Sequence, residues 1–211
     1  PSRRQRQMCI RDSSGKGKDQ TAISCVKMLN GNLYVTECLG LSGGYSDAVL
    51  EKISKVARDN KINTILVEQN FGGGMFSELL KPFLMRFHPC QLQDVRNNKT
   101  KELRIIDTLE PVMNSHRLII DRKVIEKDFR SNPQETPERR LKLQLVYQLS
   151  RISRHRGSLV HDDLVDSLAG AVAYWTEYMA QNEDLNISKR KEELLSIPVS
   201  YTHLRAHETK T

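Results

Sequence analysis

The feature that most constrains the fold is an Asn-Gly pair between two strand-like runs. The runs TAISCVKML and NLYVTECLGL flank the turn at Asn30-Gly31. Both are rich in β-branched residues and in residues that pack well on a pleated surface. An Asn-Gly pair in this setting favours the tight turn that matches the twist of two antiparallel strands. The sequence therefore predicts an antiparallel hairpin over residues 21–41.

After the hairpin, helical and strand patterns alternate. Residues 45–60 carry apolar side chains near helical spacing, with Ser46 as the candidate N-cap. Residues 62–70 form a short apolar run that ends in an acid, which is typical of a buried parallel strand. The further elements predicted, in order, are a helix over 75–87 kinked at Pro82, a weak strand over 90–95, a helix over 99–116, a short strand over 117–121, a helix over 139–154 and a long helix over 161–181.

This order of elements indicates a mixed α/β sheet with flanking helices. An antiparallel hairpin leads into parallel strands, and parallel strands need helical crossover connections. A ribonuclease H-like fold has this order, provided that one more strand precedes Ser14. We therefore predict that fold class for the chain.

The two ends of the chain look foreign to the rest. Residues 3–13 (RRQRQMCIRDS) and 199–209 (VSYTHLRAHET) resemble in-frame translations of transposase-type adapters used in short-read DNA sequencing. We interpret 1–13 and 198–211 as adapter-derived and non-native, 14–182 as the domain, and 183–197 as a charged C-terminal tail. On this interpretation the first strand is largely replaced by adapter sequence, and both native ends are cut.

Composition limits the functional classes. Of the formal charge of +7, the two foreign ends carry +3 and +1, which leaves +3 for the remainder. Such a weakly basic balance does not by itself argue for nucleic-acid binding. No apolar run is long enough for a membrane span. The cysteines of the remainder, Cys25, Cys38 and Cys90, have no C-x-x-C spacing and are expected to be reduced thiols.

The glycine-rich stretch SGKGKD (14–19) does not fit an ATP-binding loop. Gly15 and Gly17 are only two apart, and Lys18 is followed by Asp19 instead of Ser or Thr. The residues that follow read as a strand and not as a helix. We expect this loop to join two strands.

Acidic residues at two places are the strongest candidates for chemistry. Glu68 ends the run TILVE, where ligand sites of open α/β sheets gather. Asp162, Asp163 and Asp166 open the last helix at spacings that bring like charges together. Either a metal ion compensates them, or they cap the helix and are solvated. With an acid at the end of the first strand, the set suits two Mg²⁺ or Mn²⁺ ions.

Candidates for DNA contact are weaker. The glycines at 72–74 either let a DNA backbone approach closely or only form a strand-to-helix turn. The basic side chains either grip phosphates or form a solvated face. The candidate DNA-binding residues are Lys16, Lys18, Gly73, Gly74, Arg96, Lys99 and Lys101, with Arg104 close by.

Seven stretches spread over residues 14–180 resemble one known family, the C-terminal nuclease domain of the terminase large subunit of tailed bacteriophages, and in particular its short-tailed branch. The matching stretches are SGKGKDQTA, LNGNLYVTE, GGYSD, VEQNFGGGMF, IIDTLEPVM, HRLIID and HDDLVDSLA. The resemblance implies a ribonuclease H-like, metal-dependent endonuclease that cuts concatemeric viral DNA during packaging in the host-cell cytoplasm.

The family's pattern also assigns site residues. Its second metal-binding acid falls on Glu68 and its third on Asp163, with Asp166 or Asp162 assisting. Its first acid precedes the Ser-Gly loop, usually within Asp-Pro-Ser-Gly, and here Asp12 occupies that position among adapter-derived residues. The implied partners are double-stranded DNA, an N-terminal ATPase domain, the terminase small subunit and the portal or prohead.

Two other functions stay open. One is a resolvase or transposase-type nuclease of the same fold, which would cut DNA structure-selectively as a symmetric dimer. The other is a non-catalytic module that docks on DNA or on a portal, in which the acids only cap a helix. The seven matching stretches argue against the first, and the residues alone do not exclude the second.

Overall fold

The computed structural model describes residues 6–11, 20–68, 74–96 and 100–196, and the statements below concern these residues. It divides into two compact units, residues 1–176 and residues 177–211, which are described separately. The strands of the first unit are β1 (Arg6–Arg11), β2 (Thr21–Leu29), β3 (Asn32–Leu41), β4 (Thr64–Glu68), β5 (Gln91–Val95) and β6 (Leu118–Ile120).

Helices follow or separate these strands. They are α1 (Asp47–Asp59), α2 (Met75–Phe87), α3 (Lys101–Asn114), α4 (Arg122–Phe129), α5 (Pro137–Lys142), α6 (Leu145–Arg151) and α7 (Asp163–Ser196). The residues of α7 up to Thr176 belong to the first unit.

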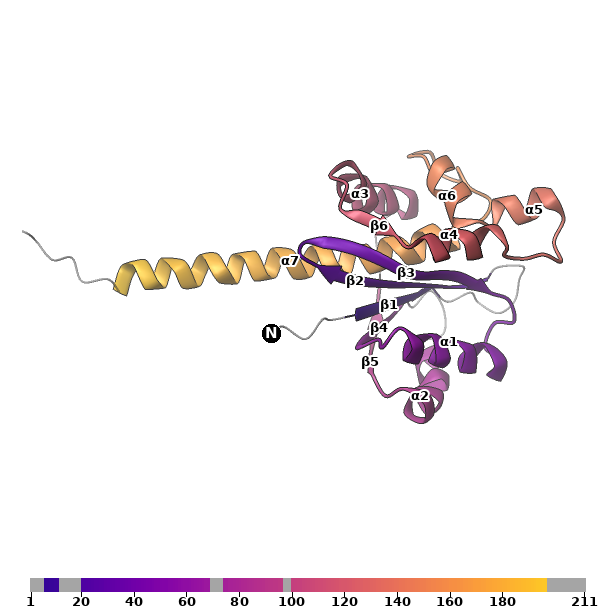
Figure 1. Ribbon diagram of the computed structural model, residues 1–211, viewed down its shortest axis with the longest axis horizontal. Helices are drawn as coiled ribbons and strands as arrows, with labels where there is room; N and C mark the ends of the chain where they lie inside the picture. The colour runs from indigo at the N-terminus through magenta and orange to yellow at the C-terminus, as the bar shows by residue number, and fades with distance from the viewer. Residues whose placement is uncertain (1–5, 12–19, 69–73, 97–99, 197–211) are drawn as a thin grey trace, which may run out of the picture. The chain divides into compact units, whose positions relative to one another are not determined.

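The six strands form one mixed sheet in the order β5-β4-β1-β2-β3-β6 (Figure 1). The predicted hairpin is confirmed: β2 and β3 pair antiparallel around Asn30 and Gly31, both of which have positive φ angles. Strand β1 lies at the centre of the sheet, antiparallel to β2 and parallel to β4. This is the mixed α/β architecture that the order of elements predicts.

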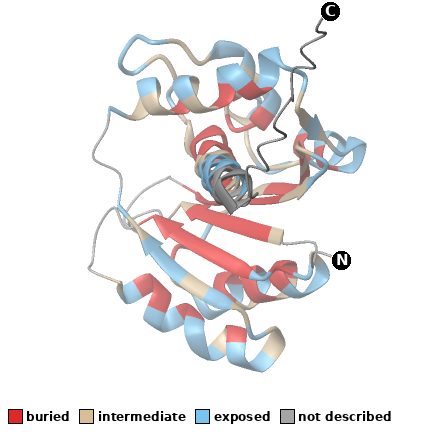
Figure 2. Cartoon of the chain, turned by 90° about the vertical axis from the view of Figure 1, so that its left-hand side faces the viewer, coloured by how far each residue is buried: buried red, intermediate tan, exposed pale blue. Residues whose placement is uncertain are grey.

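One face of the sheet is covered by α1 and α2. Alternate residues of β1 and β4, such as Ile10 and Ile65, point to this face and are fully buried. They pack with Leu50 and Ile53 of α1 and Leu80 of α2 in one hydrophobic core. Figure 2 shows the central strands as the buried layer of the molecule.

The first turns of α7 cover the opposite face. The hydroxyl of Ser167 donates to the backbone carbonyl of Cys9 at 3.0 Å, and Nε1 of Trp175 donates to the carbonyl of Val26 at 3.2 Å. Trp175 is 1% exposed. These contacts fix the start of α7 against β1 and β2, and so fix the position of the acids that open this helix.

Helix α7 approaches β1 so closely that a glycine is needed. A Cβ atom at Gly170 would lie 2.7 Å from the Sγ atom of Cys9. We expect Gly170→Ala to destabilise the fold by about 1–3 kcal/mol through overpacking. Cys9→Ala in the same chain should restore part of that loss, because it removes Sγ and leaves the Cys9 Cβ position 3.8 Å from the added Cβ atom. Urea unfolding of the two single variants and the double variant tests this; additive losses would contradict the close contact.

Strand β1 lies within the residues that we interpret from the sequence as adapter-derived, and one of its side chains fits poorly. Gln7 is 1% exposed, and neither polar atom of its side chain has a hydrogen-bond partner. Its neighbours Met8 and Ile10 are apolar and buried. A buried amide without partners costs free energy that an apolar side chain of similar size avoids.

We therefore expect Gln7→Leu to stabilise the chain by about 1–2 kcal/mol. Thermal unfolding of this variant beside Gln20→Leu makes the test, because the Gln20 amide donates hydrogen bonds to Ser42 and Asn132. Gln20→Leu should destabilise. A lower melting temperature for Gln7→Leu would show that the Gln7 amide makes favourable hydrogen bonds, and would contradict this expectation.

The structure departs from the predicted elements in three places. The helix expected over 139–154 is two short helices, α5 and α6, with the break at 143–144. Helix α4 was not predicted, because RKVIEKDF is short and mostly charged; the Asp121 side chain, which accepts from the backbone N–H of Lys123, caps its start. The segment expected to be a tail from 183 continues as helix to Ser196.

The second unit contains the rest of α7. Residues 183–193 of this helix are mostly charged or polar, and the apolar Leu185 and Ile187 among them are exposed. None of the helices in the described residues is both long and apolar enough to cross a membrane.

Candidate metal centre

Glu68 reaches the site because of its place in the sheet. It is the last residue of β4, after four buried residues, and it is itself 6% exposed. The carboxyl end of a buried parallel strand opens onto the edge where ligand sites form. A carboxylate at this depth needs a cation or several hydrogen-bond donors.

The acids at the start of α7 approach the carboxyl end of β4 from the helix that covers the sheet. Asp163 is the first residue of the helix, and the backbone N–H of Asp166 donates to the carbonyl of Asp162 at 2.9 Å. Asp166 faces the sheet and is fully buried. Negative side chains in the first turn of a helix interact favourably with its dipole, but a buried carboxylate needs more than that.

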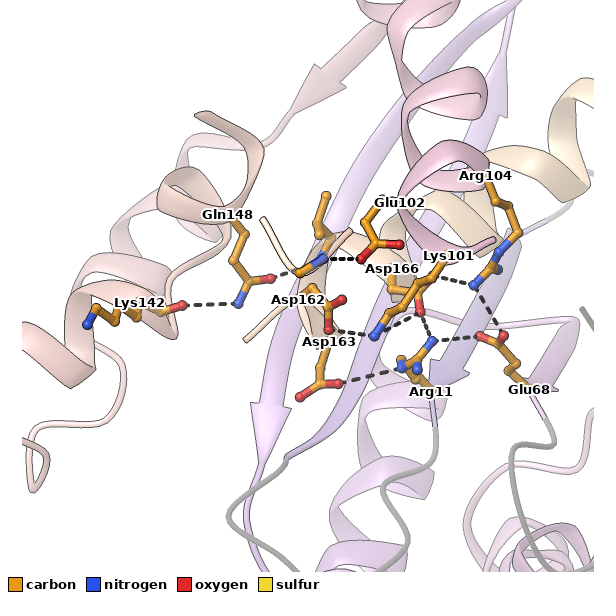
Figure 3. Close-up of polar contacts among 12 residues, drawn as sticks. Arg11, Glu68, Lys101, Glu102, Arg104, Lys142, Gln148, Asp162, Asp163 and Asp166 are labelled. Atoms are coloured by element: carbon orange, nitrogen blue, oxygen red, sulfur yellow. Dashed lines mark hydrogen bonds and ion pairs between the residues drawn. The ribbon is translucent and has the colours of Figure 1, made fainter. Parts of the chain in front are cut away.

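The compensating charge comes from three basic side chains (Figure 3). Arg104 of α3 joins the two buried acids: its Nη2 atom lies 3.2 Å from Oε1 of Glu68 and 2.6 Å from Oδ1 of Asp166. Lys101, one turn earlier, places its Nζ atom 2.5 Å from Oδ1 of Asp162 and 3.6 Å from Oδ2 of Asp166. Helix α3 thus holds β4 and α7 together through charge.

The third cation is Arg11 at the end of β1. Its Nη1 atom lies 3.3 Å from Oε2 of Glu68 and forms an ion pair with Oδ2 of Asp166, and its Nε atom lies 3.5 Å from Oδ1 of Asp163. Arg11 stands opposite Glu68 in the parallel pairing of β1 and β4. Its guanidinium therefore occupies the point where the carboxylates converge (Figure 3).

Burial shifts the pKa values of two groups in and beside the cluster. Desolvation lowers the pKa of Arg104, and the nearby Glu68 carboxylate partly opposes that shift. The guanidinium nevertheless stays charged at neutral pH. Burial, with a smaller contribution from Glu68, raises the pKa of the Cys9 thiol to about 12, so Cys9 is protonated and unreactive.

The loop that precedes α7 is held by polar contacts. Oε1 of the buried Gln148 accepts from the backbone N–H of Val165 at 3.0 Å, and a Glu102 carboxylate oxygen accepts from the N–H of Gly157 at 2.7 Å. The first contact satisfies a backbone donor at the start of α7. Both contacts limit the freedom of the acids that open the helix.

The structure brings together four of the predicted site residues and separates or omits others. Glu68, Asp162, Asp163 and Asp166 share one cluster, and Lys101 pairs with its acids. Gly74 has φ 94° and directly precedes α2, and Arg96 is exposed after β5. Several predicted residues lie outside the described ranges: Asp12, Lys16, Lys18, Gly73 and Lys99.

Sequence reasoning did not identify Arg11 as a site residue, and it offered Arg104 only as a phosphate contact. Alternate residues of β1 point to the α7 face, and Arg11 is one of them. Its place beside Glu68 follows only from the pairing of β1 with β4, which the sequence pattern does not specify.

The donor set fits a hard divalent cation in its chemistry. Glu68, Asp163 and Asp166 offer carboxylate oxygens from two elements, and a cation, the Arg11 guanidinium, already lies between them. In the described residues, no group of three or more His, Cys, Asp or Glu side chains stands in an arrangement ready for a metal ion. The carboxylate oxygens of the cluster are paired with the basic side chains instead.

Residues 11–118, about half of the chain, match the family described as the terminase of bacteriophage T7, ribonuclease H-like domain. The chain belongs to this terminase family. It is also 37% identical over 191 residues to the terminase large subunit of Enterobacteria phage T3, an alignment that covers 90% of the chain. The chain spans about a third of that relative, since the alignment covers 32% of it.

Solved terminase nuclease domains share the fold. The human cytomegalovirus terminase nuclease domain, soaked with Mn and bound to an inhibitor, has a TM-score of 0.54 and 12% identity, over 79% of this chain and 82% of that one. The large terminase nuclease from thermophilic phage G20c, with bound zinc, has a TM-score of 0.51 and 16% identity, over 80% and 81%. The ribonuclease H-like fold expected from the sequence is confirmed.

Proposed function

We propose that this chain is the divalent-metal-dependent DNA endonuclease domain of a phage terminase large subunit. The observation that carries the proposal is the convergence of Glu68, Asp163 and Asp166 at one edge of the sheet in a terminase-family fold. Solved domains of similar fold were studied with Mn or zinc, which supports a divalent cation as the cofactor.

In this proposal the acids hold the metal and the basic residues keep the acids in place. Glu68 and Asp163 would be direct ligands, with Asp12, Asp162 and Asp166 completing the set. Two Mg²⁺ or Mn²⁺ ions bound there would supply an activated water and charge stabilisation for the leaving oxygen of a phosphodiester. Arg104 aligns Glu68 with Asp166, and Lys101 turns Asp162 toward the same edge.

The substrate and partners follow from the family. We infer that the domain cuts concatemeric double-stranded viral DNA when packaging begins and ends, in the cytoplasm of the host cell. An N-terminal ATPase domain, the small subunit and the portal or prohead would act with it in the longer protein. Residues 183–197 would form the charged C-terminal tail of the domain, and residues 1–13 and 198–211 would be adapter-derived.

The test uses a version of the chain with a first strand like that of the family. This restored-strand chain carries Gln7→Val, Arg11→Val and Ser13→Pro, so that an apolar strand runs into Asp-Pro-Ser-Gly at residues 12–15. Supercoiled plasmid is incubated with it in Mn²⁺, in Mg²⁺ and in EDTA. The proposal expects nicked and linear products with a divalent cation and none in EDTA.

A folded restored-strand chain that leaves plasmid intact in both metals would contradict an autonomous endonuclease. If that chain also bound no Mn²⁺ in a calorimetric titration, the metal site itself would be disproved. A domain that docks on DNA without cutting it would then be the better account.

A further inference from the structure

Arg11 lies inside the acidic cluster and is mostly shielded from solvent. It contacts Glu68, Asp163 and Asp166, and only 14% of its side chain is exposed. Two of these acids are buried, so a positive charge at this point relieves most of their desolvation cost. The guanidinium does here what a bound cation would do.

The charge balance shows the consequence for a metal ion. Four carboxylates, from Glu68, Asp162, Asp163 and Asp166, face three basic side chains, from Arg11, Lys101 and Arg104. With Arg11 present, the cluster has one formal negative charge. Without Arg11 it has two, so these carboxylates attract a divalent cation more strongly.

Arg11 and a bound metal ion would also contact the same carboxylate oxygens. Oε2 of Glu68 and Oδ2 of Asp166 are both directed at Nη1 of Arg11. A divalent ion binds carboxylate oxygens at about 2.0–2.6 Å, a range that leaves no room for a guanidinium nitrogen at the same place. Arg11 and a metal ion between these two acids are therefore mutually exclusive.

Arg11 belongs to a strand that is poorly matched to its surroundings. Gln7, on the same face of β1, is buried without a hydrogen-bond partner. This unpartnered amide agrees with a first strand whose polar side chains are not adapted to this face of the sheet.

We propose that Arg11 acts as an internal cation that occupies the metal centre and blocks divalent ions from it. The proposal rests on the metal-site part of the proposed function. It predicts that the chain as it stands is folded but deficient in metal binding. Replacing one residue outside the predicted ligand set should then create metal affinity.

The experiment is a calorimetric titration with Mn²⁺ alone, supported by the shift of the melting temperature in Mn²⁺. Arg11→Val should bind Mn²⁺ saturably and at least about tenfold more tightly than the unmodified chain. Arg11→Gln, which keeps a polar side chain but is shorter and uncharged, should do the same. Arg11→Lys, which keeps the charge, should bind as weakly as the unmodified chain.

Three results would overturn the proposal: an unmodified chain that binds Mn²⁺ as tightly as Arg11→Val, an Arg11→Lys chain that does so, or no gain in either neutral variant. If Arg11→Val does not fold, Arg11→Gln is judged by the same criterion. The restored-strand chain separates this proposal from the proposed function. If the restored-strand chain nicks DNA but the single Arg11 variants bind Mn²⁺ no more tightly, only the proposal for Arg11 is rejected. If the Arg11 variants bind Mn²⁺ more tightly but the restored-strand chain does not nick DNA, the nuclease function is rejected and the proposal for Arg11 is supported.

Discussion

Glu68→Gln in the restored-strand chain is expected to lower Mn²⁺-dependent plasmid nicking by at least about 100-fold. Glutamine keeps the size of the side chain and one acceptor oxygen, but it removes the charge that a divalent cation requires. The backbone of β4 should be unaffected, because Glu68 is the last residue of the strand. Initial rates of nicking, measured over a range of Mn²⁺ concentrations, give the effect.

The matched control is Glu37→Gln. Glu37 is also a buried acid of the sheet, 7% exposed, and it pairs with Lys127 at 2.6 Å, outside the cluster. This variant should lose some stability and keep its nicking rate within about twofold. Equal losses of activity in the two variants would mean that Glu68 acts through folding and not through metal.

The second large effect concerns the stability of the unmodified chain. Asp166→Asn should lower the free energy of unfolding by about 3 kcal/mol, because it removes the buried charge that partly buried basic groups pair with. The Asp166 side chain is fully buried, and it pairs with Arg11, Lys101 and Arg104. The loss is placed at the lower end of the usual range because Arg11 and Arg104 also contact Glu68.

Asp163→Asn is the comparison for this measurement. Its side chain is 17% exposed and reaches Nε of Arg11 at the longer distance of 3.5 Å. We expect a loss of at most about 1 kcal/mol. Urea unfolding of both variants at neutral pH checks the difference, and equal losses would show that burial does not set the cost.

Much of the fold was predictable from local pattern. The Asn30-Gly31 turn, the apolar strand that ends at Glu68 and the helix opened by Asp163 each carry a signal in a few consecutive residues. Helix α4 and the break between α5 and α6 carry none. Asp128 explains the break: its carboxylate accepts from the backbone N–H groups of Leu145 and Val146, so α6 is capped by a residue 17 positions away.

The site was predictable in its acids and not in its cations. Glu68 and Asp163 stand at ends of elements, where the chain order alone brings them to one edge of the sheet. Lys101 and Arg104 also suit a solvated face or a phosphate contact, and only the packing of α3 against that edge turns them inward. Arg11 needed the register of β1 against β4, which no local pattern gives.

The most direct measurement is anomalous diffraction from crystals of the Arg11→Val chain soaked in Mn²⁺. The account predicts an anomalous peak bonded to a carboxylate oxygen of Glu68 and to one from the acids that open α7. Crystals of the unmodified chain, soaked in the same way, should show no peak there and a guanidinium in its place. A peak at another position, or no peak while Glu68 stays paired with Arg104, would contradict the assignment of this cluster as the metal centre.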